Sequence, residues 1–306
     1  MNIADYLDNN AIDYFTRKNN WRALQLLVWN WLSIAAILMA VYYWTNPLTV
    51  LLAIALLGGR QLGLAVLMHE CGHHTFFSSP AVNRFVGQWL CAAPTFNDLN
   101  EFVAEHRLHH RQAGTEQDPN LANYQAYPVD RASFRRKLTR DLSGRTGIRL
   151  ISYILVTALG IFNNDKRENA KPALRILWGQ CLLALILTLM MSPWLYLLWL
   201  SAIITAYMVV VRIRQIAEHA VLPDLFDADP RNNSRTTLPR WWERLLIAPN
   251  FVNYHLEHHF MASVPCYNLA KLHRFLKRRG AYDNTYIYQS YGEVIDRAVV
   301  SNALAV

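Results

Sequence analysis

Two long runs without a charged residue dominate the chain. Residues 23–59 and 176–211 contain no Asp, Glu, Lys or Arg, so the runs are 37 and 36 residues long. A single helix of that length would measure about 54 Å, whereas the hydrocarbon layer of a bilayer is about 30 Å thick. Each run is therefore predicted to cross a membrane twice.

Both runs contain turn residues near their middle. Thr45-Asn46-Pro47 interrupts the first run, and Ser192-Pro193 interrupts the second. Proline stops a preceding helix, and the small polar residues beside it favour a turn. The sequence therefore predicts two transmembrane helical hairpins. Their four spans are expected at residues 23–45, 47–69, 173–191 and 193–214.

Two shorter apolar stretches lie outside these runs, at residues 85–97 and 150–164. They hold 13 and 15 uncharged residues, which is short of the roughly 20 that a span requires. Interfacial and re-entrant helices have this length, so we expect neither stretch to span. The predicted fold class is an all-α integral membrane protein. A single domain over residues 1–306 would carry a cytosolic helical cap formed by residues 70–172 and 215–306.

The distribution of charge predicts the orientation. The net charge is +8, and all 30 Lys and Arg lie outside the two charge-free runs. The positive-inside rule places such residues in the cytoplasm, together with the open ends of the hairpins. Both termini are therefore expected there. The first residues are acidic and polar, so we expect the first hairpin, and not a cleaved signal peptide, to direct insertion.

Positive charge is concentrated in two segments. Residues 131–149 contain seven Lys or Arg against one Asp, and residues 271–279 contain five. Such segments next to a membrane attract anionic lipid, and docking of an acidic protein partner is the alternative. No nucleic-acid recognition motif accompanies them, so nucleic acid is not an expected partner.

The histidines are the strongest chemical signal. Residues 69–74 read HECGHH, residues 106–110 read HRLHH and residues 255–259 read HLEHH. Residues three and four apart share a face of a helix, so each box would aim two or three imidazoles at one point. Two H-x-x-H-H motifs are expected by chance in about one such chain in ten thousand. The candidate metal ligands are His69, His73, His74, His106, His109, His110, His219, His255, His258 and His259.

The predicted topology places all these histidines on one side of the membrane. Two hairpins return the chain to the cytoplasm before each box and before His219. If residues 150–164 spanned, the third box would face the opposite side from the first two. A shared site therefore requires four spans.

So many imidazoles imply two metal ions. Neutral imidazole suits zinc, copper, iron and nickel, and a zinc ion takes about four ligands. Carboxylates beside the histidines are expected to fix the tautomers of ligating rings, with plain solvation as the alternative. They are Glu70, Glu105, Glu218 and Glu257. The four cysteines are too scattered for a CxxC metal framework or a disulfide pattern.

The three boxes, in this order and with these gaps, resemble those of the membrane fatty acid desaturases. Residues 253–273, NYHLEHHFMASVPCYNLAKLH, are similar to the third-box region of bacterial members. The resemblance extends from the first hairpin to about residue 280. It implies a four-span helical protein of the bacterial inner membrane, a centre of two iron ions, and oxygen-dependent desaturation of a long-chain fatty acyl lipid.

The resemblance also implies which residues bind iron. It carries the ligand role to eight box histidines: His69, His73, His106, His109, His110, His255, His258 and His259. His74 points about 100° from His73 on a helix, so its role stays open. The family often has a further ligand after the fourth span, which here is His219. Gln215, one turn earlier, is expected to orient a metal-bound water.

Two further expectations concern the surroundings of the boxes. Gly114 and Pro119 both break helices, so the segment GTEQDPN is predicted to end the box-two helix. Asp118 in this segment is expected to hydrogen-bond a ligating histidine.

The oxygen-dependent reaction that the resemblance implies needs electrons, which we expect another protein to supply. The sequence has no nucleotide-binding glycine motif, no cysteine quartet and no added cytochrome domain. A ferredoxin, or a b-type cytochrome with its reductase, is the expected external donor. Hydroxylases, ketolases and alkene-forming decarboxylases resemble the same family, and they remain alternatives to a desaturase.

Overall fold

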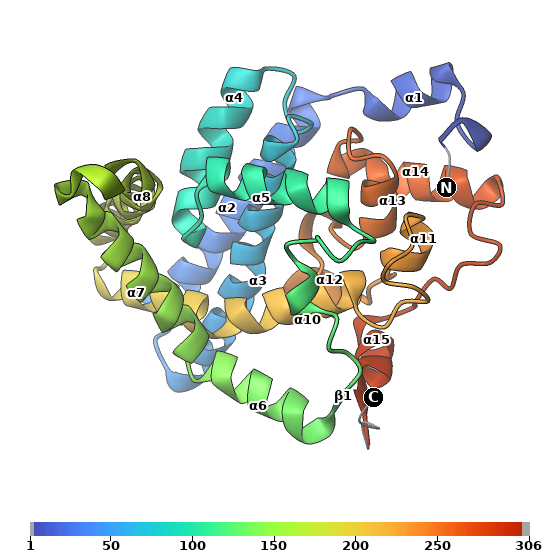
Figure 1. Ribbon diagram of the computed structural model, residues 1–306. Helices are drawn as coiled ribbons and strands as arrows, with labels where there is room; N and C mark the ends of the chain where they lie inside the picture. The colour runs from blue at the N-terminus through green and yellow to red at the C-terminus, as the bar shows by residue number, and fades with distance from the viewer. Residues whose placement is uncertain (1–2, 302–306) are drawn as a thin grey trace.

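The computed structural model describes residues 3–301 and is built almost entirely of helices (Figure 1). After α1 (Asn9–Thr16), helices α2 (Asn20–Tyr43) and α3 (Pro47–Gly72) form the first predicted hairpin. The Asn46 side chain accepts hydrogen bonds from the backbone N–H groups of Leu48 and Thr49. Pro47 occupies the first position of α3, where its missing N–H costs nothing. The predicted break at residues 45–47 is confirmed.

The second hairpin has a similar break. Helix α8 (Arg167–Met190) ends just before the Ser192-Pro193 turn, and α9 (Trp194–Ala202) begins after it. A π-helical segment (Ile203–Tyr207) joins α9 to α10 (Met208–His219). The chain therefore runs as one long helix from the turn to the last residue of α10, which is His219.

Five helices within residues 3–301 are long and apolar enough to cross a membrane. They are Asn9–Tyr43, Pro47–Gly72, Arg145–Phe162, Asn164–Met190 and Trp194–His219. The third contains residues that we predicted not to span, and length and composition alone do not separate it from the others. It is also the least buried of the five: 17% of its most apolar part is buried, against 67% for Pro47–Gly72.

The other short apolar stretch is not among these five helices. Residues 80–95 form α4 (Pro80–Phe85), a π-helical segment (Val86–Ala92) and a 3-10 turn (Ala93–Thr95). The side chains of Gln180 and Trp199 donate hydrogen bonds to backbone carbonyls of this turn. The stretch therefore packs against α3 and α8, with Phe85 and Trp89 exposed.

The box-two helix is held by the second hairpin. Helix α5 (Leu99–Gln112) is capped by Asp98, whose side chain accepts from the backbone N–H groups of Asn100 and Glu101. Arg175 on α8 donates to both Asp98 oxygens, at 2.7 and 3.0 Å. Helix α5 ends at Gln112, and Gly114 follows with a φ of +84°. The predicted end of this helix is confirmed.

The remaining elements complete the part of the molecule that we predicted to be the cap. They are α6 (Arg131–Leu142), α7 (Arg145–Leu159), α11 (Pro230–Asn233), α12 (Trp241–Leu246), α13 (His255–Phe260), α14 (Cys266–Arg278) and α15 (Tyr291–Ala298). Further 3-10 turns lie at Ile3–Asp5, Leu121–Asn123, Gly160–Phe162, Asn164–Lys166 and Pro249–Phe251. Strands β1 (Val129–Asp130) and β2 (Val299–Val300) pair in parallel and are a small departure from the all-α prediction.

Helix α3 lies in the core and carries the first box at its C-terminal end. Its residues Leu57, Leu62 and Leu67 are fully buried. The Asn250 side chain, which precedes the third box, donates to the carbonyl of Gly63 and accepts from Asn30 on α2. The first and third boxes are therefore tied to the same helix pair.

Candidate metal centre

Nine of the ten predicted histidines converge in two adjacent groups. In each group one ligand atom per residue lies within 4.8 Å of all the others. The five-histidine group consists of His69, His73, His106, His110 and His258, and the four-histidine group consists of His109, His219, His255 and His259. The three boxes and His219 therefore form one centre, although residues of one group are up to 189 positions apart.

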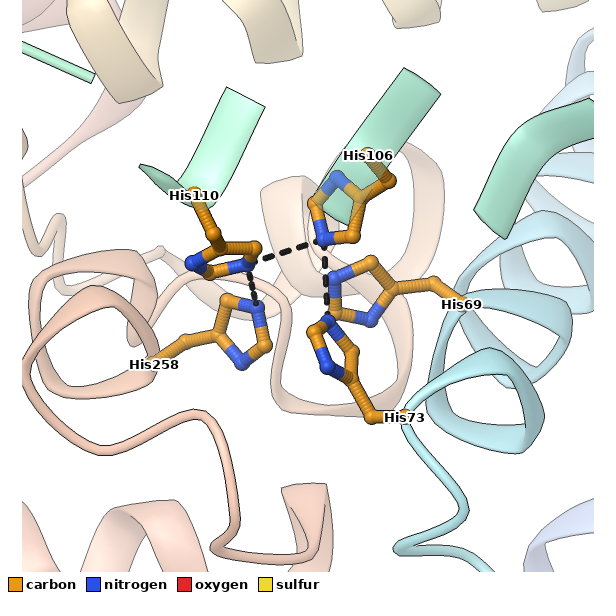
Figure 2. Close-up of side chains that lie close together, drawn as sticks. All are labelled: His69, His73, His106, His110 and His258. Carbon is orange, nitrogen blue, oxygen red and sulfur yellow. Dashed lines mark hydrogen bonds between the residues drawn. The ribbon is translucent and has the colours of Figure 1, made fainter. Parts of the chain in front are cut away.

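The five-histidine group gathers rings from α3, α5 and α13 (Figure 2). The Nε2 atom of His106 lies 3.0 Å from Nε2 of His73 and 2.9 Å from Nε2 of His110. The Nε2 atom of His110 lies 2.9 Å from that of His258. Four rings therefore point the same ring nitrogen at one place.

The four-histidine group is similar. The Nε2 atoms of His219 and His255 are 2.8 Å apart, and those of His109 and His259 are 3.3 Å apart. The His109 and His219 ring centroids lie 4.9 Å from each other. Helices α5, α10 and α13 supply these rings.

Helical spacing divides each H-x-x-H-H box between the two groups. In box two, His106 and His110 are one turn apart and enter the five-histidine group, while His109 turns to the other group. In box three the assignment is reversed. There His255 and His259 enter the four-histidine group, and His258 enters the five-histidine group. One box can therefore serve two metal ions, because i and i+4 share a face and i+3 lies beside it.

The spacing of the nitrogens suits a metal ion. With metal–nitrogen bonds of about 2.1 Å, ligands at right angles place their nitrogens about 3.0 Å apart. The observed Nε2 separations in the five-histidine group are 2.9 and 3.0 Å. Each group could therefore hold one ion.

The Nδ1 atoms of several rings face acceptors on the outer side of the centre. His109 Nδ1 lies 2.8 Å from Asp118 Oδ1, and His69 Nδ1 lies 3.1 Å from Glu70 Oε1. The backbone carbonyl of Asn233 accepts from Nδ1 of His219 at 2.8 Å. A donor at Nδ1 leaves Nε2 unprotonated and free to bind a metal.

Burial favours the neutral form of four rings in the five-histidine group. Burial and the neighbouring His69 lower the pKa of His73 to about 3. Burial and the neighbouring histidines, His73 first, lower the pKa of His110 to about 2. The pKa values of His106 and His258 also lie well below the ordinary range, for the same reasons. Neutral imidazole is the form that binds a metal ion.

His74 does not join either group. Helix α3 ends at Gly72, and His74 adopts a left-handed backbone conformation with a φ of 57°. The chain leaves the helical conformation between His73 and His74, and only the His73 ring reaches the five-histidine group. The possibility that His74 is a ligand therefore finds no support in the structure.

Two of the predicted carboxylates differ from expectation. Glu105 is exposed and has no hydrogen bond to a histidine within residues 3–301, because adjacent helix positions point about 100° apart. Glu257 is fully buried, but it accepts from His273 Nδ1 and Tyr282 Oη, each at 2.6 Å, and from Thr236. Its histidine partner is therefore His273, the one histidine that was not predicted to be a ligand and that belongs to neither group.

The other two carboxylates contact histidines of the centre. Glu70 also accepts from the backbone N–H of Cys266 at 2.8 Å, which joins box one to the first turn of α14. Glu218 lies 3.5 Å from His255 Nδ1 and accepts from Arg214 Nε at 2.6 Å. Asp118 also accepts from the Tyr124 hydroxyl. Nothing in the sequence singled out Arg214 or Tyr124, because their partners are set by tertiary packing.

A cavity of about 240 Å³ opens beside both groups. Its walls include His69, His109 and His255, and Gln215 on α10 also lines it. A second cavity of about 330 Å³ shares Phe102 and two other residues with the first. Helices α7 and α8 line this second cavity with Leu150, Ile154, Ala173 and Ile176, and its other walls include Asp98, Glu101 and Glu105. The two cavities are therefore neighbours.

The comparisons with known proteins agree with this arrangement. The fatty acid desaturase family model matches residues 45–291. The chain is 25% identical to a dihydrorhizobitoxine desaturase of Bradyrhizobium elkanii, over 80% of this chain and 71% of that protein. It is 25% identical to an sn-1 oleoyl-lipid 12-desaturase of Synechocystis, over 76% and 70% of the two chains. It is also 25% identical to a beta-carotene ketolase of Paracoccus, over 74% and 80%.

The family model covers the first hairpin turn, all three boxes and His219. Its extent, the two converging histidine groups and the apolar helices lead to the same conclusion. The chain belongs to the fatty acid desaturase family and is a membrane oxidoreductase of the desaturase type.

Proposed function

We propose that this protein uses dioxygen to introduce a double bond into a long-chain fatty acyl group of a membrane lipid. The observation that carries the proposal is the pair of histidine groups beside one cavity. The Synechocystis relative, named for an oleoyl lipid, supports a lipid-linked acyl chain as the substrate class.

We assign one iron ion to each histidine group. Nine converging, mostly buried imidazoles fit iron, which imidazole binds well. When bound, the iron pair supplies the dioxygen activation that breaks an unactivated C–H bond. His69, His73, His106, His110 and His258 would hold one ion, and His109, His219, His255 and His259 the other.

The surrounding residues would hold these ligands in place. Asp118, Glu70 and Glu218 each contact the Nδ1 atom of a ligating ring, which orients Nε2 toward the metal. Gln215 lines the cavity, where its amide would orient a water on the four-histidine side. His74, Glu105 and Glu257 have no part in this assignment.

The acyl chain would approach through the second cavity. Phe102 lines both cavities, and α7 and α8 supply apolar residues to the second. These apolar residues would hold the carbon chain and keep it in register with the metals.

Hydroxylation, ketone formation or alkene-forming decarboxylation of a fatty acid, alkane or other hydrophobic chain is the second candidate. The specific support is the Paracoccus ketolase, which aligns over 74% of this chain. The same histidine centre serves either outcome, because the outcome depends on how the carbon chain is held and not on the ligands.

We also propose that four of the five apolar helices span. The convergence of the three boxes requires an even number of crossings between box one and box three. Three candidate helices lie between these boxes, so one of them lies on the membrane surface. Arg145–Phe162 is the shortest and least buried of the three. Residues 1–306 would then form one domain with spans near 23–45, 47–69, 173–191 and 193–214.

This topology places both termini and the metal centre in the cytoplasm, in a bacterial inner membrane. The cap would consist of residues 70–172 and 215–306. The positive-inside rule supports the orientation, since all Lys and Arg lie outside the two charge-free runs. Electrons would come from an external ferredoxin, or from a b-type cytochrome with its reductase.

One experiment separates the candidates. The protein is expressed in a host of known lipid composition, and extracted acyl chains are compared by mass spectrometry. An acyl chain that is 2 Da lighter indicates desaturation, and one that is 16 Da heavier indicates hydroxylation. A chain that is 14 Da heavier indicates a ketone, and an alkene one carbon shorter indicates decarboxylation. The His258→Ala variant is the inactive control. Purified protein with one zinc per chain, and no iron after anaerobic loading, would overturn the assignment of two iron ions.

A further inference from the structure

A groove between α6 and α7 has the composition of an anion site. Its volume is about 750 Å³, and nine residues line it. Six are basic and three carry a hydroxyl, and none is acidic. They are Arg135, Arg136, Lys137, Arg140, Arg145 and Arg149, with Ser133, Thr139 and Thr146.

The backbone brings the basic residues of the two helices together. Arg136 and Arg140 are one turn apart on α6, and Arg145 and Arg149 are one turn apart on α7. The chain reverses at Gly144, whose φ of +79° is a conformation that favours glycine. Two stripes of guanidinium groups therefore line one groove.

Little in the protein neutralises this charge. Within residues 3–301, Arg140 is the one groove residue with an ion pair, at 3.6 Å from Asp141. Asp141 is fully buried and already accepts from Arg212 and Thr146. Burial, with Arg212 and Arg140 nearby, lowers the pKa of Lys137. The groove therefore carries several positive charges without a partner.

Exposed apolar side chains are close in sequence to the groove residues. Leu142 and Ile148, which follow Asp141 and precede Arg149, are 57% and 53% exposed. Farther along, Val156 and Leu159 on α7 and Phe162 in the 3-10 turn after it are 69%, 66% and 88% exposed. A helix with basic residues at one end and uncovered apolar residues along its length is typical of a membrane interface.

We propose that this groove binds the phosphate of an anionic phospholipid. Arginine forks match phosphate oxygens in pairs, and the acyl chains of the same lipid would cover Leu142 and Ile148. A soluble acidic protein could pair with the basic side chains of the groove, but it would leave Leu142 and Ile148 exposed. The site is separate from the histidine centre and does not depend on the reaction catalysed there.

The test measures lipid binding by the full-length protein in detergent. Native mass spectrometry follows phosphatidylglycerol, with phosphatidylcholine as the zwitterionic comparison. The variant carries Arg136→Gln, Arg145→Gln and Arg149→Gln. Each basic side chain near an anionic surface contributes about fivefold in affinity, so the triple variant should lose roughly a hundredfold at low salt. Its retention of iron and of its thermal melting profile reports correct folding.

A second triple variant removes the same charge elsewhere. Arg274→Gln, Lys277→Gln and Arg278→Gln alter α14, which does not line the groove. This control should keep phosphatidylglycerol binding close to that of the unaltered protein. An equal loss in both variants would show a response to net charge only and would overturn the site.

Two further measurements distinguish a phospholipid from free phosphate and from an acidic protein as the occupant of the groove. If inorganic phosphate displaces the lipid at equal concentration, the lipid assignment is wrong. If the groove variant keeps phosphatidylglycerol but loses binding of an acidic ferredoxin, the groove is a protein-docking surface instead. Neither measurement uses substrate turnover, so failure here leaves the proposed reaction untouched.

Discussion

The Nε2 atoms of His110 and His258 lie 2.9 Å apart, although 148 positions separate them in the chain. His258 is the one box-three histidine in the five-histidine group. Box two and box three therefore each contribute ligand candidates to both groups. Each group depends on the positions of both α5 and α13.

Removal of His258 should empty one group. We expect His258→Ala to lower the iron content from about two ions per chain to about one, and to abolish turnover. His74→Ala is the matched control, because His74 belongs to neither group, and it should keep iron and activity. Iron analysis of the purified variants makes the measurement. Iron loss in His74→Ala equal to that in His258→Ala would contradict the grouping.

Asp118 should act through His109. Its Oδ1 lies 2.8 Å from His109 Nδ1, so Asp118→Asn replaces a charged acceptor by a neutral one. Loss of such a partner typically costs about 10- to 100-fold in metal affinity or activity. Iron affinity is measured by competition with a chelator, and Glu116→Gln on the same turn is the exposed control. Unchanged affinity in Asp118→Asn would limit this residue to the turn after α5.

His219 and Gln215 should give different results. His219 Nε2 lies 2.8 Å from His255 Nε2 and belongs to the four-histidine group. His219→Ala should therefore lose much of one iron ion and nearly all activity. Gln215→Ala should lower turnover with a smaller loss of metal, because its amide lines the cavity without joining the group. Normal turnover of His219→Ala would remove this residue from the centre.

His273 should matter for stability and not for metal content. Its Nδ1 donates to the fully buried Glu257 at 2.6 Å. His273→Ala removes one partner of a buried carboxylate, which typically costs about 1 to 3 kcal/mol. The melting temperature should fall by several degrees while about two iron ions remain. Tyr282→Phe removes another partner of Glu257 and should change stability in the same direction. Iron loss without destabilisation would show that His273 acts at the metals.

The four-span topology can be tested by cysteine labelling in a Cys181→Ser background, since Cys181 is the exposed native cysteine. Thr115 is exposed in the loop after box two. Thr115→Cys should react with an impermeant thiol reagent only after the membrane is permeabilised, because the proposed topology places the cap in the cytoplasm. Trp44→Cys, at the first hairpin turn and 69% exposed, should react in intact cells. External labelling at residue 115 would refute the four-span arrangement.

The hairpins were predictable because their signals are local. Charge-free runs, Asn46-Pro47 and Ser192-Pro193 act within a few residues, and the helices begin and end where these signals lie. Arg145–Phe162 shows the limit of the same reasoning. Its length and hydropathy match those of a span, and its proposed place on the surface rests on the convergence of the boxes together with its low burial.

The sequence alone determined that each H-x-x-H-H box presents imidazoles one turn apart, because helical spacing does this whatever surrounds them, and from this it predicted a metal centre. Only the tertiary structure decided their partition into groups of five and four, which depends on how α3, α5, α10 and α13 cross. It also left His74 out of both groups, where the backbone leaves α3, and paired Glu257 with His273. Such choices depend on contacts between residues far apart in the chain, which no local pattern encodes.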